Sequence, residues 1–161
     1  MKTILIVGNC GSGKTWVMKQ LLTELNADRA VKRGLWHYRT DHDRVGIIGK
    51  YEGHMYDGSD RLSMALMKEA LDFREHQRQQ GLTMIGEGDR LMNKTFLKVF
   101  RPTIIKITDN GTQGRKLRKS NQSAQHLQRV QSRVNSFPHH YLVSNSFSAL
   151  SCVLHQVNEE S

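Results

Sequence analysis

The sequence predicts an α/β fold in which helices cover both faces of a mostly parallel central sheet of about five strands. Three observations lead to this prediction. The chain has 161 residues, 37% of them hydrophobic, which is enough for one core but too little for two ordinary domains, so we expect a single domain over residues 1–161. Apolar runs alternate along the chain with segments of helical periodicity. The first apolar run, residues 3–7, is continuous and β-branched, as in a strand buried on both faces of a parallel sheet.

The first third of the chain is expected to contain a strand, a helix and a strand pair. After strand 3–7, a glycine-rich loop leads into a helix that starts at Lys14, where apolar residues recur at helical spacing. Two weaker strands, 35–38 and 45–51, flank a charged segment and fit a hairpin.

A long helix and three strands are expected in the rest of the chain. The helix is expected to start at Ser59 or Asp60, since either residue is a suitable N-cap, and to end before Gly81. The remaining expected strands, with helical patterns between and after them, are 82–85, 103–108 and 141–143.

The loop after the first expected strand matches the Walker A pattern in full: Gly8, Asn9, Cys10, Gly11, Ser12, Gly13, Lys14 and Thr15. Its glycines let the backbone wrap around phosphate oxygens, so that N–H groups and the N-terminus of the next helix point at the anion. We expect Lys14 to contact the β and γ phosphates and the Thr15 hydroxyl to bind Mg²⁺. The motif therefore predicts ATP and Mg²⁺ as cofactors. The alternative, an ordinary glycine-rich turn, would not require both Lys14 and Thr15.

An acidic residue on a neighbouring strand is expected to complete the metal side of the site. Glu87 and Asp89 follow the apolar residues 82–85, at a strand end of the kind where ligands collect in open α/β sheets. We expect Glu87 to act in catalysis and to bind Mg²⁺. Asp89 has an alternative role as the N-cap of a helix that starts at Arg90. The eight histidines show no ligand spacing, so no metal beyond Mg²⁺ is expected.

The last third of the chain is basic. The net charge is +9, and no Asp or Glu occurs between Asn110 and Asn158. Residues 110–135 are expected to form a lid over the phosphates or a surface that contacts nucleic acid, and the two roles can share one surface. The lid arginines expected to act in catalysis are Arg115 and Arg129, and the residues expected to contact DNA are Arg118, Lys119 and Arg133. The alternative is a solvated basic face.

The segment 49–61, rich in glycines, aromatic residues and acids, is expected to bind the acceptor. Phosphoryl transfer to an alcohol needs a carboxylate that orients the hydroxyl group or accepts its proton. Asp60 is the preferred candidate, with helix capping as its alternative role, and the adjacent Arg61 is expected to contact nucleic acid. The other candidates for this base are Asp57, Asp41 and Asp43. Tyr51 and Tyr56 fit either stacking on a base or packing in the core.

Together these motifs resemble small bacteriophage-encoded P-loop kinases, and among them the group that phosphorylates 5-hydroxymethyluridine within DNA. The resemblance rests on residues 49–51, 57–64, 87–90 and 120–122 beside the Walker A loop, and it covers nearly the whole chain. It implies the P-loop NTPase fold and an ATP-dependent kinase that acts on the hydroxymethyl group of a base in DNA. The order of elements is more distantly similar to polynucleotide kinases. The chain departs from the common Walker B pattern, because Glu87 stands where an Asp usually ends the strand.

Two other functions are compatible with these motifs. A kinase of a free nucleoside or nucleotide uses the same chemistry but needs no extended positive surface. A nucleic-acid-dependent ATPase would hydrolyse ATP without modifying its partner. If DNA is the substrate, its base must be flipped out or single-stranded, because a base inside a duplex cannot reach the γ phosphate.

The sequence also predicts a cytoplasmic protein, which the resemblance places in an infected bacterial host. Only two cysteines occur, Cys10 and Cys152, without the spacing of a metal or disulfide site. The apolar start of the chain is too short for a signal peptide, and no later run reaches the roughly 18 apolar residues that span a bilayer, so no membrane contact is expected.

Overall fold

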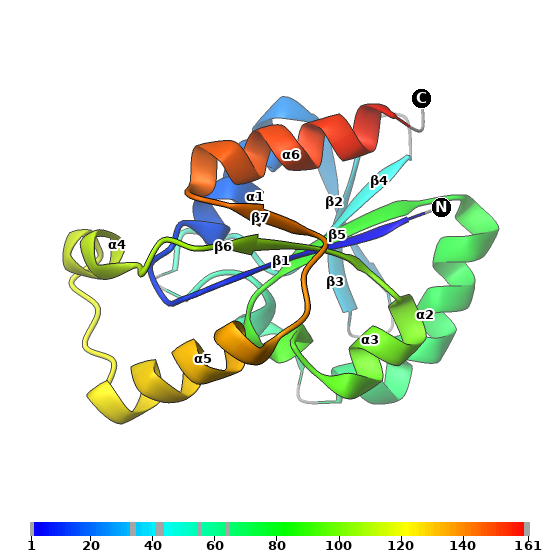
Figure 1. The fold of residues 1–161 in the computed structure, drawn as a ribbon. Coiled ribbons are helices and arrows are strands. Elements are labelled where there is room, and N and C mark those ends of the chain that lie inside the picture. The colour runs from blue at the N-terminus through cyan, green and yellow to red at the C-terminus, as the bar shows by residue number, and fades with distance from the viewer. Residues whose placement is uncertain (1, 33–34, 41–43, 55, 64, 160–161) are drawn as a thin grey trace.

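The structure is a computed structural model that describes residues 2–32, 35–40, 44–54, 56–63 and 65–159. A mixed β-sheet lies at its centre (Figure 1). In spatial order, the strands of the described residues are β2 (Ala27–Lys32), β3 (Leu35–Thr40), β4 (Val45–Ile48), β5 (Thr83–Glu87), β1 (Thr3–Gly8), β6 (Thr103–Ile107) and β7 (Tyr141–Val143). Neighbouring strands from β4 to β7 pair in parallel, whereas β2 with β3 and β3 with β4 pair antiparallel.

The predicted α/β class is confirmed, but the predicted sheet of about five mostly parallel strands is wrong. The described residues form a seven-stranded mixed sheet. The expected hairpin is present as β3 and β4, with His37 opposite Ile48, and β2 adds a further antiparallel strand outside it. Strand β2 lies at the edge of the sheet, where Asp28 and Arg29 are exposed. An edge strand can carry charged residues, so β2 lacks the apolar run from which a strand would be predicted.

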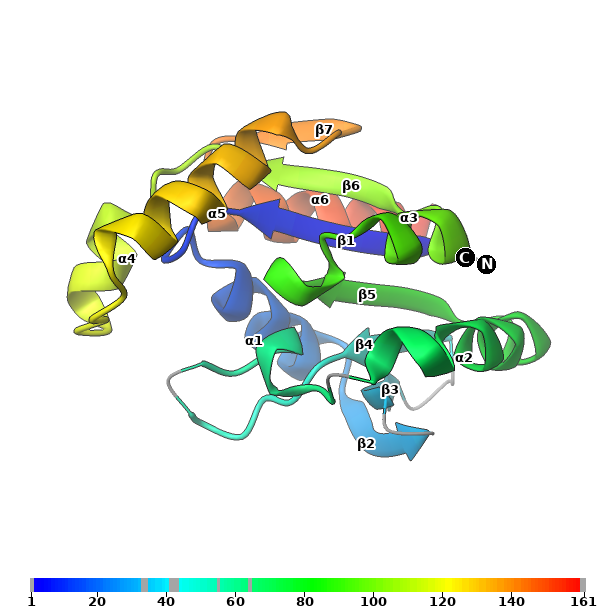
Figure 2. The same ribbon diagram turned by 90° about the horizontal axis from the view of Figure 1, so that it is seen from below.

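Helices cover both faces of the sheet (Figures 1 and 2). One face carries α1 (Lys14–Glu24) and α6 (Ser146–Asn158), and the other carries α2 (Leu66–Gln80), α3 (Lys94–Phe100) and α5 (Ala124–Ser136). The shorter elements are α4 (Thr112–Leu117) and two 3₁₀ turns, η1 (Ser59–Arg61) and η2 (Asp89–Leu91). None of the described helices is both long and apolar enough to cross a membrane.

Strand β1 connects the two halves of the core. All of its residues are buried, as the continuous apolar run predicts. Because side chains alternate along a strand, Leu5 and Val7 pack with α2, α3 and α5, whereas Ile4 and Ile6 pack with α1 and α6. The loop that leaves β1 is therefore anchored by a strand buried on both sides.

The long helix starts later than the sequence predicts. Residues 59–61 form η1, and α2 begins only at Leu66. Gly58 enters η1 with a φ angle of 112°, and Leu62 leaves it with an extended ψ angle of 158°, so the helical geometry does not continue. The Leu62 side chain instead turns into the core, where it is 3% exposed. As a result, Ser59 and Asp60 lie outside α2.

The helix expected to start at Arg90 also starts later. Residues 89–91 form η2, and α3 begins at Lys94. Its N-cap is Asn93, whose side chain accepts a hydrogen bond from the backbone N–H of Phe96 at 2.8 Å. The two 3₁₀ turns η1 and η2 contact each other and follow β4 and β5 in the chain.

Candidate active site

The loop of residues 8–15 connects β1 to α1 at the carboxyl end of the parallel strands (Figure 2). Gly11 and Gly13 have φ angles of 83° and 95°, which a side chain disfavours. No described side chain caps the N-terminus of the 11-residue helix α1. Within the described residues, Asn9 Oδ1 and Ser12 Oγ are buried without a hydrogen-bond partner. The Ser12 hydroxyl can donate a hydrogen bond, and an unpaired donor beside a helix N-terminus fits a bound phosphate.

Lys14 lies over this loop. Its Nζ donates hydrogen bonds to the carbonyl oxygens of Gly8 at 2.8 Å and Asn9 at 2.9 Å. Burial lowers the pKa of Lys14, and the neighbouring Glu87 carboxylate opposes this effect. The lysine and the glutamate that the sequence assigned to one site therefore lie close enough to interact.

Glu87 ends β5 and is 3% exposed. The Tyr51 hydroxyl donates a hydrogen bond to Glu87 Oε1 at 3.2 Å, and Gly58 approaches this oxygen so closely that a Cβ atom there would overlap it. Burial raises the pKa of Glu87 to about 7, although Lys14 opposes the shift. Of the two roles considered for Tyr51, the structure supports core packing, since its ring lies against the apolar cluster that includes Tyr38. The hydrogen bond to Glu87 was not foreseen.

Asp60 lies on η1 and interacts electrostatically with Lys14. Burial of its carboxylate raises the pKa of Asp60, and Asp89 adds to this effect, although the residue keeps part of its surface exposed. The helix-capping role considered for Asp60 is wrong, because the N-cap positions of η1 and α2 are Gly58 and Ala65 and neither has a side-chain cap. Its position beside the phosphate loop therefore needs another explanation.

The other candidate carboxylates have different surroundings. Asp57 is buried and accepts hydrogen bonds from the backbone N–H groups of Gly53 and His54 at 2.8 and 3.1 Å, and it pairs with Lys19 at 3.2 Å. Burial alone would raise the pKa of Asp57, but hydrogen bonds from the backbone of Glu52, Gly53 and His54 and from the Lys19 side chain together outweigh it and lower the pKa. Asp57 thus fixes the shape of its loop. Asp89 pairs with a lid arginine and does not cap a helix at position 90, and Asp41 and Asp43 lie outside the described residues.

The basic segment packs directly on the phosphate loop through α4. Three glycines, Gly11, Gly111 and Gly114, bring the two backbones so close that a Cβ atom on any of them would overlap a backbone atom of the other segment. Arg115 Nη1 donates hydrogen bonds to the carbonyl oxygens of Cys10 at 2.6 Å and Asn110 at 2.9 Å. Gly111 and Gly114 were not among the residues expected at the site, although their spacing of about one helical turn was a usable signal.

The remaining basic residues of the lid have distinct positions. Burial is the main cause of the pKa shifts of Lys14 and Glu87; the Arg118 charge adds slightly to the lowering of the Lys14 pKa and slightly opposes the rise of the Glu87 pKa, so this arginine acts on both groups. Lys119 is exposed next to it. Arg129 is exposed on α5 and makes no ion pair with the described residues, whereas Arg133 pairs with Asp89 at 2.6 Å.

Arg61 was expected to contact nucleic acid, and its charge is compensated locally. Its Nη1 lies 2.8 Å from Glu52 Oε2 and 3.5 Å from Asp57 Oδ1. These ion pairs hold Arg61 on the acceptor loop, so it is a weaker candidate for a phosphate contact than Arg118 or Arg129.

Thr15, in the first turn of α1, and Glu87 supply the hydroxyl and carboxylate oxygens that suit Mg²⁺. Mg²⁺ in nucleotide sites commonly takes one or two protein ligands, together with phosphate and water oxygens. Within the described part of the chain, no group of three or more His, Cys, Asp and Glu side chains is arranged to hold a metal ion. The hydroxyl of Thr15 and the carboxylate of Glu87 fit a metal ion that a nucleotide brings with it. No protein-family model and no curated protein matches this chain.

Proposed function

We propose that this chain is an ATP-dependent kinase with a P-loop NTPase fold, which phosphorylates the hydroxymethyl group of 5-hydroxymethyluridine in DNA. The observation that carries the proposal is that Lys14, over the phosphate loop, interacts electrostatically with two carboxylates in different environments. Glu87 is buried, whereas Asp60 keeps part of its surface exposed, where an acceptor can reach it. A kinase needs both a metal-side and an acceptor-side group.

On the nucleotide side, the loop amides and Lys14 bind the β and γ phosphates of ATP. Thr15 and Glu87 would hold Mg²⁺, which neutralises charge on the phosphates when it is bound. Arg115 supports the loop by donating to the carbonyl oxygen of Cys10. Arg118, which is coupled to Lys14 and Glu87, is the lid arginine that stabilises charge on the transferring group.

On the acceptor side, Asp60 orients the hydroxyl group and accepts its proton. The hydroxyl oxygen forms a bond to the γ phosphorus while the bond from that phosphorus to the oxygen bridging the β phosphate breaks, and ADP leaves. The raised pKa of Asp60 suits a group that must take up a proton during turnover. Lid segments α4 and α5 limit the access of water, which would otherwise compete with the acceptor.

A polymeric acceptor is favoured over a free nucleoside by charge. The chain carries a net charge of +9, and the segment from Asn110 to Asn158 contains no acidic residue. A single nucleoside needs no such surface, whereas a DNA strand gains affinity from every phosphate that it places beside a cation.

The test is the fate of the γ-phosphate of labelled ATP. Acceptors are single-stranded and duplex DNA with 5-hydroxymethyluridine, the same DNA with thymidine, and the free 5-hydroxymethyl nucleoside. We expect label in the hydroxymethylated DNA alone. Label in the free nucleoside would point to a nucleoside kinase, and release of inorganic phosphate without transfer would point to an ATPase. Either result would contradict the proposed acceptor.

Asp60→Asn tests the proposed base. The substitution keeps the size of the side chain and removes its ability to accept a proton, so turnover should fall by about 10²- to 10⁴-fold while ATP affinity is retained. Asp28→Asn is the control, because Asp28 is exposed on the edge strand β2. Normal turnover of Asp60→Asn would remove Asp60 from the mechanism.

A further inference from the structure

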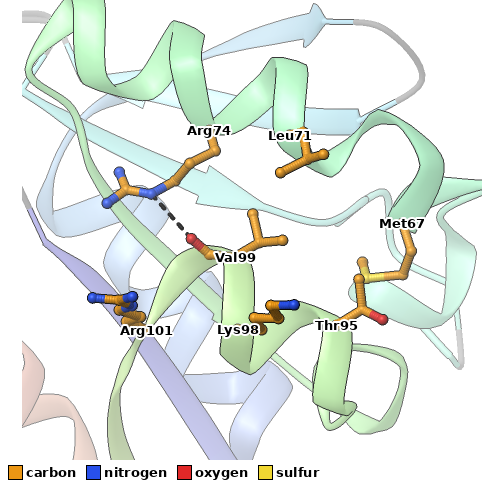
Figure 3. A pocket seen from close by; sticks show the side chains of 7 residues that line it. All are labelled: Met67, Leu71, Arg74, Thr95, Lys98, Val99 and Arg101. Atoms are coloured by element: carbon orange, nitrogen blue, oxygen red, sulfur yellow. Dashed lines mark hydrogen bonds between the residues drawn. The ribbon is translucent and has the colours of Figure 1, made fainter.

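A hollow lies between α2 and α3, on the face of the sheet that also carries α5 (Figure 3). This α2–α3 groove has a volume of about 600 Å³ and is lined by Met67, Leu71, Arg74, Thr95, Lys98, Val99 and Arg101. Three of these residues are basic and none is acidic. The groove therefore combines a positive rim with an apolar wall.

The α2–α3 groove begins next to the proposed acceptor site. Met67 and Thr95 belong to the first turns of α2 and α3, which follow the turns η1 and η2 that carry Asp60 and Asp89. Figure 3 shows Met67 and Thr95 at one end of the groove and the two arginines at the other. The eight helical residues from Met67 to Arg74 span about 10 Å along the axis of α2, which is long enough to lie beside a short stretch of a nucleic-acid strand.

Two of the three cations that line the groove are exposed to solvent, and the third is held across it by a hydrogen bond. Lys98 and Arg101 are exposed and form no ion pair with the described residues. Arg74 donates from Nε to the carbonyl oxygen of Val99 at 3.3 Å, which fixes its side chain across the groove. Leu71 is 70% exposed and offers an apolar surface between these charges.

We propose that the α2–α3 groove binds the single-stranded segment of DNA that adjoins the acceptor base. This inference rests on the proposed function for the identity of the strand. Phosphates lie along the basic rim, and unstacked bases contact Leu71 and Met67. A single strand is favoured over a duplex because only unpaired bases expose faces for such contact and because the acceptor base itself must leave a duplex. Continuity with the acceptor site and the positive net charge favour DNA over an acidic peptide.

The test measures binding of unmodified single-stranded DNA by fluorescence anisotropy at several salt concentrations, without ATP. The variant is Lys98→Gln with Arg101→Asn, in which Asn suits the left-handed φ angle of 47° at position 101. The control is Arg29→Gln with Arg44→Gln, two exposed residues outside the groove. Both double variants lower the net charge from +9 by two, and circular dichroism verifies that each is folded.

The groove variant should bind DNA more weakly, and its slope of log K against log salt should be shallower by about 1.4, or 0.7 for each lost phosphate contact. The control should keep a slope close to that of the wild type. Equal slopes for the two variants would overturn the proposal that the groove binds DNA. The same conclusion would follow if the Lys98 and Arg101 substitutions weakened the binding of polyglutamate and left the binding of DNA unchanged. Because no phosphoryl transfer is measured, a shallower slope in a protein that fails the labelling test would reject the kinase and retain the groove.

Discussion

Replacing Glu87 with Gln should change how the stability of the protein depends on pH. In the folded chain, burial raises the pKa of Glu87 to about 7, from 4.5 for the unperturbed group, although Lys14 opposes the shift. The difference of about 2.5 pKa units corresponds to about 3 kcal/mol in the free energy of unfolding.

The direction of the effect depends on which state loses its proton first. As the pH rises above 4.5, the unfolded chain ionises this carboxyl group, whereas the folded chain keeps the proton up to a pH of about 7. The contribution of Glu87 to stability is therefore fully present below pH 4.5 and is lost as the pH rises through 7. Gln cannot ionise, so Glu87→Gln should gain about 3 kcal/mol relative to the wild type between acidic and mildly alkaline pH.

Urea unfolding followed by circular dichroism, in buffers without divalent cations, measures this difference. Glu75→Gln is the control, because Glu75 is fully exposed and its hydrogen bond with Arg78 lowers its pKa. That variant should not show the relative gain at alkaline pH. Equal pH dependence of unfolding in the wild type and Glu87→Gln would show that Glu87 does not have a raised pKa in the folded protein.

Three further predictions concern the phosphate loop and the lid. Lys14→Ala should abolish phosphoryl transfer and keep a native circular-dichroism spectrum, and unchanged turnover at saturating ATP would contradict the role of the loop. Arg115→Ala should mainly weaken ATP binding, because the Arg115 guanidinium donates to a carbonyl oxygen of the loop, whereas Arg118→Ala should mainly lower kcat. Steady-state kinetics with a DNA acceptor distinguish the two effects, and the reverse pattern would exchange the roles of the two arginines. Gly114→Ala should destabilise the protein by about 1–3 kcal/mol in urea unfolding, because its Cβ would overlap the loop backbone, while the exposed neighbour in Gln113→Ala should tolerate the change.

The sequence predicted the glycine-rich loop between β1 and α1 and the central strands well, for a physical reason. A strand buried on both faces needs a continuous apolar run, and β1, β5 and β6 each have one. The Walker A pattern places glycines where the backbone needs them, as the positive φ angles of Gly11 and Gly13 demonstrate. In both cases the sequence signal and the structural requirement lie in the same few residues.

Contacts between distant segments could not be predicted in this way. The packing of Gly114 on Gly11 joins residues about a hundred positions apart, and neither glycine indicates its partner. The hydrogen bond from Tyr51 to Glu87 also joins residues that are distant in the sequence, and neither residue type indicates its partner. Capping was a reasonable interpretation of Asp60, because Asp is a common N-cap, but the extended backbone at Leu62 separates it from the helix.

The surroundings of the two carboxylates favour different roles for them in the proposed phosphoryl transfer. Glu87 accepts a hydrogen bond from Tyr51, and Gly58 closes over the same oxygen, so an acceptor hydroxyl has little room to approach it from the side of the acceptor loop. Because its pKa is raised to about 7, Glu87 is partly protonated near neutral pH. A nearby Mg²⁺ would favour the ionised form, so nucleotide binding would be coupled to the charge of this group. Asp60 keeps part of its surface exposed and lies on η1, at the end of the acceptor segment 49–61 and before α2. A base must touch the hydroxyl that it deprotonates, and on this criterion of access Asp60 is the better base and Glu87 the better metal ligand.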